Sequence, residues 1–227
     1  MTNTPAMNRY SWYGKLPSAG DFLQRRFPDT LQRQWSHWFQ VGLLAWQQEE
    51  QRSGERPFSK APVWNFVVPP MLGSQMIQMG CLLPGRDSVG RHYPVCLQLS
   101  FTPAEWSSRL LGQAESWYQQ LGRLGLHAVR NSYSASQLDE MLMTIPAPQP
   151  VEPQKRSDIL DVIGYDDDGQ STLGWPQAAE CFDPLRQTSY WWTNRCDGYP
   201  LYTHVHSGNF TGQLFTLLFD PAGGARP

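Results

Sequence analysis

Two glycine-punctuated stretches carry the charged residues that could do chemistry together. The first, "YGKLPSAGDF", contains Lys15 and Asp21, and the second, "PGRDSVGRHYP", contains Asp87 and Arg91. Opposite charges on two loops can serve general acid–base catalysis when burial separates their pKa values. They can equally fix the loops, with Asp21 and Asp87 capping turns and Arg91 forming a buried bidentate ion pair with one of them. The sequence leaves both interpretations open.

The first stretch does not have the pattern of a nucleotide-binding loop. A P-loop has a glycine, four residues and then Gly-Lys-Ser/Thr, because its backbone N–H groups wrap the phosphates. Here a leucine follows Gly14-Lys15, and an arginine stands five positions before Gly14. Gly14 and Gly20 instead allow unusual φ angles or close backbone approach, and Pro17 fixes a bend. The stretch therefore predicts a tight connection that follows a strand.

Other candidate ligand groups give no metal or cofactor site. His204 and His206 would share one face of a strand, but a metal needs three or four ligands and the sequence nominates no others. The run Asp166–Asp168 lacks the alternate spacing of a calcium loop, so it predicts a solvated turn. The four cysteines stand apart without a C-x-x-C pair, which predicts free buried thiols rather than a zinc site: Cys81, Cys96, Cys181 and Cys196.

Composition excludes several classes of function. A net charge of −2 and a pI near 6.2 offer no basic surface for nucleic acid. The opening residues have no basic and apolar signal pattern, and no apolar run reaches the roughly 20 residues that span a bilayer. We therefore expect a cytoplasmic protein without membrane insertion. Ten tryptophans predict an aromatic core or interface. The absence of a G-x-S-x-G motif or a catalytic cysteine signature favours a non-enzyme with no catalytic residues.

Hydrophobic spacing predicts the elements that must hold these loops. Residues three and four apart indicate helices, and short β-branched or aromatic runs between turns indicate strands. We expect Thr102 and Pro103 to start the second helix, and Ser134 or Ser136 to cap the third. The predicted helices cover residues 29–52, 102–129 and 134–145. The predicted strands cover residues 9–17, 61–70, 75–85, 92–101, 159–165, 189–194, 201–208 and 212–220.

This order of elements predicts an α+β fold. Short connections between consecutive strands favour a mostly antiparallel central sheet, flanked by helices in a three-layer α/β/α-like arrangement. We expect a single compact domain with a core over residues 1–145 and a proline-rich linker or loop over residues 146–156. Residues 157–227 would supply strands that complete the sheet or form a small C-terminal lobe.

The two loops also carry a family resemblance. "YGKLPSAGDFLQRRFP" resembles the G-K-hydrophobic-P-x-x-G-D-F opening of the TagF (ImpM) family of type VI secretion-associated proteins. "LPGRDSVGRHYPVCL" resembles its P-S-x-D-x-V-G-R-x-[FY]-P block, with a departure at Gly85-Arg86, and "APVWNFVV" resembles its AP-x-W-x-F strand. The three blocks span roughly residues 10–99 in the family's order. They nominate these functional or fold-signature residues: Gly14, Lys15, Pro17, Gly20, Asp21, Phe22, Trp64, Asp87, Gly90 and Arg91.

The resemblance implies a cytoplasmic regulator rather than a secreted effector. The family is associated with post-translational repression of type VI secretion, acting through a scaffold protein with a forkhead-associated domain. Some relatives carry a fused phosphatase domain, but this chain has no room for one, so that activity is not carried over. A small-ligand-binding or hydrolytic protein with a charged cleft between loops 14–21 and 85–91 is the alternative. A structural subunit of the secretion apparatus is a third hypothesis.

Overall fold

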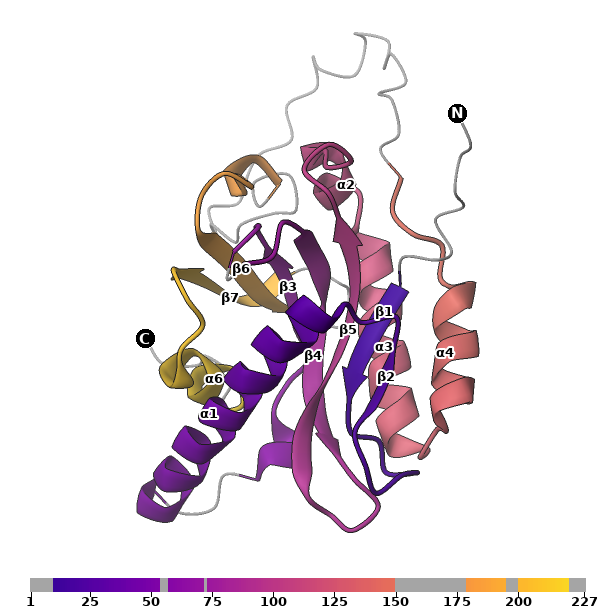
Figure 1. Ribbon diagram of the computed structural model, residues 1–227, viewed down its shortest axis with the longest axis vertical. Helices are drawn as coiled ribbons and strands as arrows, with labels where there is room; N and C mark the ends of the chain where they lie inside the picture. The colour runs from indigo at the N-terminus through magenta and orange to yellow at the C-terminus, as the bar shows by residue number, and fades with distance from the viewer. Residues whose placement is uncertain (1–9, 54–56, 72, 150–178, 195–199, 221–227) are drawn as a thin grey trace, which may run out of the picture.

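The described strands form one seven-stranded sheet in which every neighbouring pair is antiparallel. The computed structural model describes residues 10–53, 57–71, 73–149, 179–194 and 200–220 (Figure 1). The strand order is β2-β1-β5-β4-β3-β6-β7. The strands are β1 (Tyr10–Gly14), β2 (Leu23–Arg25), β3 (Trp64–Val68), β4 (Ile77–Arg86), β5 (His92–Phe101), β6 (Thr188–Asn194) and β7 (Pro200–Ser207).

Helices cover both faces of this sheet (Figure 1). On one face lie α1 (Asp29–Ser53) and α6 (Gly212–Leu218), and on the other lie α3 (Glu115–Arg130) and α4 (Ala135–Thr144). The short α2 (Ser108–Gly112) and the 3₁₀ helix η2 (Phe58–Lys60) sit in connections. Strands between two helical layers are buried on both faces, and this is the pattern of all of β3 and of β4 up to its last residue. The three-layer α+β fold predicted from the sequence is confirmed.

The layer under α1 is unusually aromatic. Trp35 of α1 lies 5.1 Å, centroid to centroid, from Phe66 of β3, and its Nε1 donates to the Gln78 side chain at 2.7 Å. Trp38 reaches α6, where its ring lies 5.7 Å from that of Phe215. The tilted and edge-to-face geometries are those that aromatic rings favour. Tryptophans Trp35 and Trp38 thus lie in an aromatic core, which is one of the two places, core or interface, that the composition predicted.

The predicted helix over residues 102–129 is wrong as a single element. Thr102 begins a turn, with Glu105 N donating to its carbonyl at 3.0 Å. The Ser107 hydroxyl then caps α2 by accepting from Arg109 N, and α3 starts separately at Glu115. The serine cap inside the apolar pattern therefore starts a separate short helix, because it satisfies an N–H group that a continuous helix would use internally. The cap predicted at Ser134 is correct, and it forms a capping box with Gln137.

The predicted strand over residues 212–220 is also wrong, because these residues form α6. Thr211 accepts a hydrogen bond from Leu214 N and so caps the helix. Leu214, Phe215 and Leu218 are buried at helical spacing against α1. Tertiary packing of this apolar face outweighs the strand preference of its phenylalanines and threonine.

Part of the C-terminal prediction lies outside the described residues. The predicted strand 159–165 falls there, as does most of the proline-rich segment 146–156. β6 and β7 extend the central sheet beyond β3. The division into residues 1–145, 146–156 and 157–227 stays a prediction.

Candidate functional site

The two charged stretches meet at one end of the sheet, where the chain leaving β1 crosses the β4–β5 hairpin. Gly14 permits this crossing, since a Cβ there would lie 2.4 Å from the Pro94 carbonyl oxygen. Gly85 does the same from the hairpin side, where a Cβ would lie 2.7 Å from the Lys15 carbonyl oxygen. Real Cβ atoms do not tolerate such distances, so both positions need glycine. The close crossing brings Lys15 to Asp87, 72 positions away in sequence.

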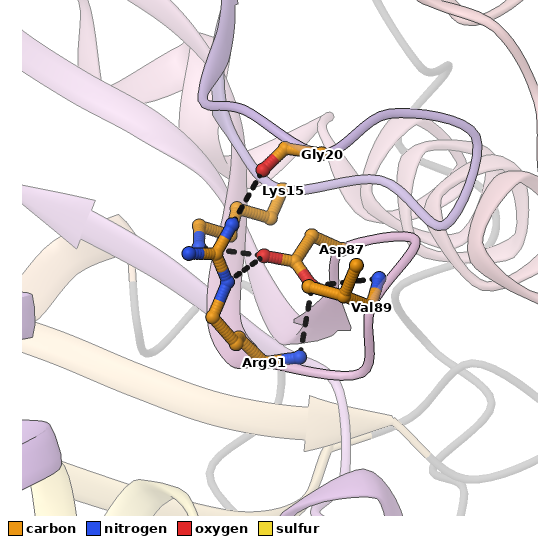
Figure 2. A network of polar contacts seen from close by, with 5 residues as sticks. All are labelled: Lys15, Gly20, Asp87, Val89 and Arg91. Carbon is orange, nitrogen blue, oxygen red and sulfur yellow. Dashed lines mark hydrogen bonds and ion pairs between the residues drawn. The ribbon is translucent and has the colours of Figure 1, made fainter.

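The Asp87 carboxylate lies at the centre of the site (Figure 2). Its Oδ2 accepts from Lys15 Nζ at 2.8 Å and from Arg91 Nε at 2.6 Å. Its Oδ1 accepts from the backbone N–H groups of Val89 at 3.1 Å and Arg91 at 2.8 Å. Both oxygens are therefore occupied, by two charged donors and two backbone donors.

These contacts fix the protonation state of Asp87. Its side chain has no exposed surface, and burial by itself would raise the pKa of the carboxyl group. The hydrogen bonds from Lys15 and Arg91 and the Lys15 charge outweigh burial and hold the pKa of Asp87 well below its usual range. Asp87 is thus charged at neutral pH and anchors both loops. A carboxylate that is fully hydrogen-bonded and this acidic is a poor general base.

The same network ties the two loops together through their backbones. Gly90 has a φ of +88°, which lets the hairpin turn close with Gly90 N donating to the Asp87 carbonyl at 3.0 Å. Arg91 Nη2 donates to the Gly20 carbonyl at 2.7 Å, and Ser88 N donates to the Ala19 carbonyl at 2.9 Å. The loops that carry the motif residues therefore form one fixed unit.

An apolar and arginine-bearing surface lies on the outside of this unit. Phe22 is 50% exposed, packs edge-on against Tyr93 at 4.7 Å and has Lys15 Nζ 4.7 Å from its ring centroid. Val89 at the hairpin tip is 72% exposed, and the Arg91 side chain is 63% exposed. We call Phe22, Val89 and Arg91 the loop surface.

The structure brings most of the residues nominated from the sequence into one network, and places the others outside it. Lys15, Gly20, Asp87, Gly90 and Arg91 form the network, with Gly14 beneath it. Pro17 lies in the turn closed by Ala19 N and the Leu16 carbonyl at 3.1 Å. Asp21 is exposed and makes no hydrogen bond or ion pair with another described residue, so it caps no turn there. Trp64 is buried elsewhere, donating to the Leu218 carbonyl of α6 at 2.6 Å.

The predicted ion pair of Arg91 forms with Asp87, but the prediction that it is bidentate and buried is wrong, because the Arg91 side chain is 63% exposed. The Arg91 guanidinium contacts Asp87 through Nε alone, and its Nη2 donates to the Gly20 carbonyl. Lys15 supplies the buried cation, because its side chain is 8% exposed. Lys15 directly follows β1, and its side chain is buried against the hairpin. The Arg91 side chain reaches the same carboxylate while most of it stays exposed to solvent.

The remaining candidate ligand groups form no metal centre in the part of the chain described. His204 and His206 share a face of β7, with ring centroids 6.4 Å apart. No group of three or more His, Cys, Asp or Glu side chains there is placed to hold a metal ion. Cys81 and Cys96 are free and buried as expected, whereas Cys181 is free but exposed. Cys196 and Asp166–Asp168 lie outside the described residues.

Two hollows beside α3 were not predicted from the sequence. One lies between α3, the start of β3 and the end of β6, and includes Asn65, Gly122 and Arg123. The other lies between α3 and α4 and shares Arg123. None of Lys15, Asp21, Asp87 and Arg91 lines either hollow. The sequence does hold one signal, because Asn65 interrupts the apolar strand "WNFVV", where asparagine is disfavoured.

Residues 11–145 match the TagF N-terminal domain, Type VI secretion system-associated, and the chain therefore belongs to that family. Its fold is similar to that in the crystal structure of PA0076 from Pseudomonas aeruginosa PAO1, with a TM-score of 0.71 and 22% identity over 96% of this chain and 97% of that one. A search of curated proteins found no match. No helix among the described residues is long and apolar enough to cross a membrane.

Proposed function

We propose that the protein is a non-enzymatic cytoplasmic regulator that represses type VI secretion after translation. It acts by binding the scaffold protein of the apparatus that bears a forkhead-associated domain. The family membership supports an association with the secretion system, and the matched region contains both loops. The proposal assigns the scaffold to the loop surface formed by Phe22, Val89 and Arg91.

One observation carries this assignment: exposed side chains stand on a backbone that is already fixed. Buried contacts on Asp87 hold both loops, so binding would not have to order them. Aromatic and arginine side chains at the centre of an interface commonly supply most of its binding energy. Phe22 and Arg91 provide these side-chain types on the same two loops that carry the exposed, apolar Val89.

The same geometry supports binding over catalysis. General acid–base chemistry needs a group that exchanges a proton near working pH. Asp87 is held charged by Lys15 and Arg91, and Asp21 stands apart from the network. The loops therefore suit presentation of a surface to a protein partner.

Calorimetry with the purified scaffold tests the proposal. The wild-type protein is titrated with the scaffold, both before and after phosphorylation of the scaffold, and saturable binding of micromolar affinity or tighter is expected in at least one state. Val89→Ser and Phe22→Ala should each weaken binding about tenfold or more, because truncation of a central anchor commonly loses over 1 kcal/mol.

Leu185→Ser is the matched control for these variants. Leu185 is 91% exposed and apolar, but it lies outside both loops, so its replacement should leave the affinity unchanged. The absence of binding in either phosphorylation state would refute repression by scaffold binding. Equal losses in all three variants would refute the assignment to the loop surface.

A further inference from the structure

The two edges of the sheet differ in how well they are protected against pairing with a further strand. β2 forms one edge and has only three residues, and Arg26, which directly follows it, pairs with Asp139 of α4. β7 forms the other edge, has eight residues and carries no Lys, Arg, Asp or Glu (Figure 1). Short edge strands and charged edge residues are common ways in which proteins prevent pairing with another chain. The edge at β7 has neither.

The register between β6 and β7 determines which backbone groups of β7 point outwards. Gly208 N donates to the Gln187 carbonyl at 2.7 Å, so these two residues form a hydrogen-bonded pair. Hydrogen-bonded and non-hydrogen-bonded pairs alternate along an antiparallel ladder, and the register is regular along the second half of β7. The backbone N–H and C=O groups of Thr203, Val205 and Ser207 therefore point away from β6. No other described strand pairs with them.

The side chains of this part of β7 are symmetric in type about Val205. Val205 is 50% exposed, and Thr203 and Ser207 on the same face are exposed as well. His204 and His206 share the other face, on either side of Val205. An antiparallel strand of the same sequence, centred on Val205, would place valine opposite valine, threonine opposite serine and histidine opposite histidine. This symmetry favours a second copy of the chain as the partner of the edge.

We propose that β7 pairs with β7 of a second copy about a twofold axis at Val205, which joins the two sheets into one. The N–H and C=O groups of Val205 bond to those of Val205 in the other copy, and Thr203 and Ser207 exchange the same bonds. Burial and the neighbouring His206 lower the pKa of His204, so His204 is uncharged at neutral pH and does not repel the histidine opposite. This edge is separate from the loop surface, so the proposal stands whether or not the scaffold binds there.

Analytical ultracentrifugation of the full chain at neutral pH measures this association. The mass should rise from 25.9 kDa towards twice that value between about 1 μM and about 200 μM protein. One strand pair buries less area than a standard protein interface, so a dissociation constant on the order of 10 μM is expected. A mass that stays at 25.9 kDa throughout would overturn the proposal and leave the edge open to a strand from another protein.

Two variants separate pairing through β7 from association through another surface. Val205→Lys places two like charges directly opposite each other and should weaken the dimer about tenfold or more. Leu185→Lys adds the same charge to a side chain that is 91% exposed but lies outside β7, so it should leave the dimer unchanged. Circular dichroism of both variants should match the wild type, because both side chains already face solvent. Equal dimerisation of the two variants would overturn the assignment to β7.

Disulfide formation tests the register of the pair. In the proposed dimer the two Val205 Cα atoms lie about 5.5 Å apart, which a disulfide can bridge. The two Thr203 Cα atoms lie about 14 Å apart, because each stands opposite Ser207, four residues further along the strand. With Cys181 and Cys196 replaced by serine, Val205→Cys should form a linked dimer on mild oxidation, and Thr203→Cys should not. Failure of Val205→Cys to link, or equal linkage of both variants, would contradict the proposed pairing.

Discussion

Two buried polar side chains, Asp87 in the loops and Asn65 in the hollow, have the same exposure of 2% but opposite surroundings. Asp87 accepts hydrogen bonds on both oxygens, from Lys15, Arg91 and the hairpin backbone. Asn65 has one partner and one unpaired oxygen. A buried polar group with all its hydrogen bonds made fixes the structure around it, whereas one that lacks a partner costs free energy in the folded state. The first region is therefore fixed by its own contacts, whereas the second leaves one polar atom without a partner among the described residues.

The largest difference should appear when each polar group is removed. Asp87→Asn leaves Lys15 buried without its counter-ion and should lower the melting temperature by about 10 °C. Asn65→Val removes an amide that is already half unpaired and should lower it by no more than about 3 °C. Thermal unfolding followed by circular dichroism measures both. Equal shifts would contradict the distinction between the two regions.

Replacing a glycine by alanine should also affect stability differently in the two regions. Gly85→Ala places a Cβ 2.7 Å from the Lys15 carbonyl and the Val95 side chain, and overpacking of this kind destabilises by about 2 kcal/mol. Gly122→Ala meets its nearest atom at 3.4 Å and improves helix propensity, so it should be neutral or stabilising by about 0.5 kcal/mol. Urea denaturation gives both free energies of unfolding. Destabilisation by Gly122→Ala would show that the hollow is more tightly closed than its shape indicates.

Acid should separate the two regions further. The pKa of Asp87 is lower in the folded protein than its ordinary value of 3.8, so its contribution to stability is present above about pH 4 and is lost as the pH falls. Wild-type stability should therefore decline more steeply from pH 5 to pH 2 than that of Asp87→Asn. The pKa of Asp139 is also lowered, by Arg26 and Trp12 against the effect of burial. Asp139 is present in both the wild type and Asp87→Asn, so its contribution to the pH dependence cancels when the two curves are compared. Parallel stability curves would exclude Asp87 as a stabilising charge.

The smallest effect on stability is expected on the loop surface itself. Val89→Ser changes a side chain that is 72% exposed, so its free energy of unfolding should stay within about 0.5 kcal/mol of the wild type. The same change is expected to weaken scaffold binding. A large loss of stability would mean that Val89 supports the hairpin rather than a partner.

The sequence predicted the loops better than it predicted their contacts. Glycine and aspartate in short connections have local causes, so both loops and α1 could be located from spacing alone. The partner of Asp87 could not, because Lys15 and Arg91 are equally plausible cations until the path of β1 is known. Lys15 is the buried partner because the chain that leaves β1 crosses the β4–β5 hairpin at Gly85.

The hollow that includes Asn65 and Arg123 could not be predicted from the sequence, because it also depends on how distant segments pack. Asn65 stands out in the sequence because its neighbours are apolar, but Arg123 is one of two exposed arginines on an amphipathic helix. Their proximity depends on how α3 packs across β3. The errors over residues 102–129 and 212–220 have the same origin, since Ser107 and Thr211 act as helix caps that tertiary packing selects.

Hydrogen exchange of the protein with and without the scaffold tests the central claim most directly. The loops are held by their own buried network, and the scaffold is proposed to cover their outer surface. Mass spectrometry of exchanged peptides should therefore show added protection in residues 14–22 and 85–91, with no change around Leu185. Protection confined to α3 and β6, with both loops unchanged, would contradict the assignment of the loops to the partner.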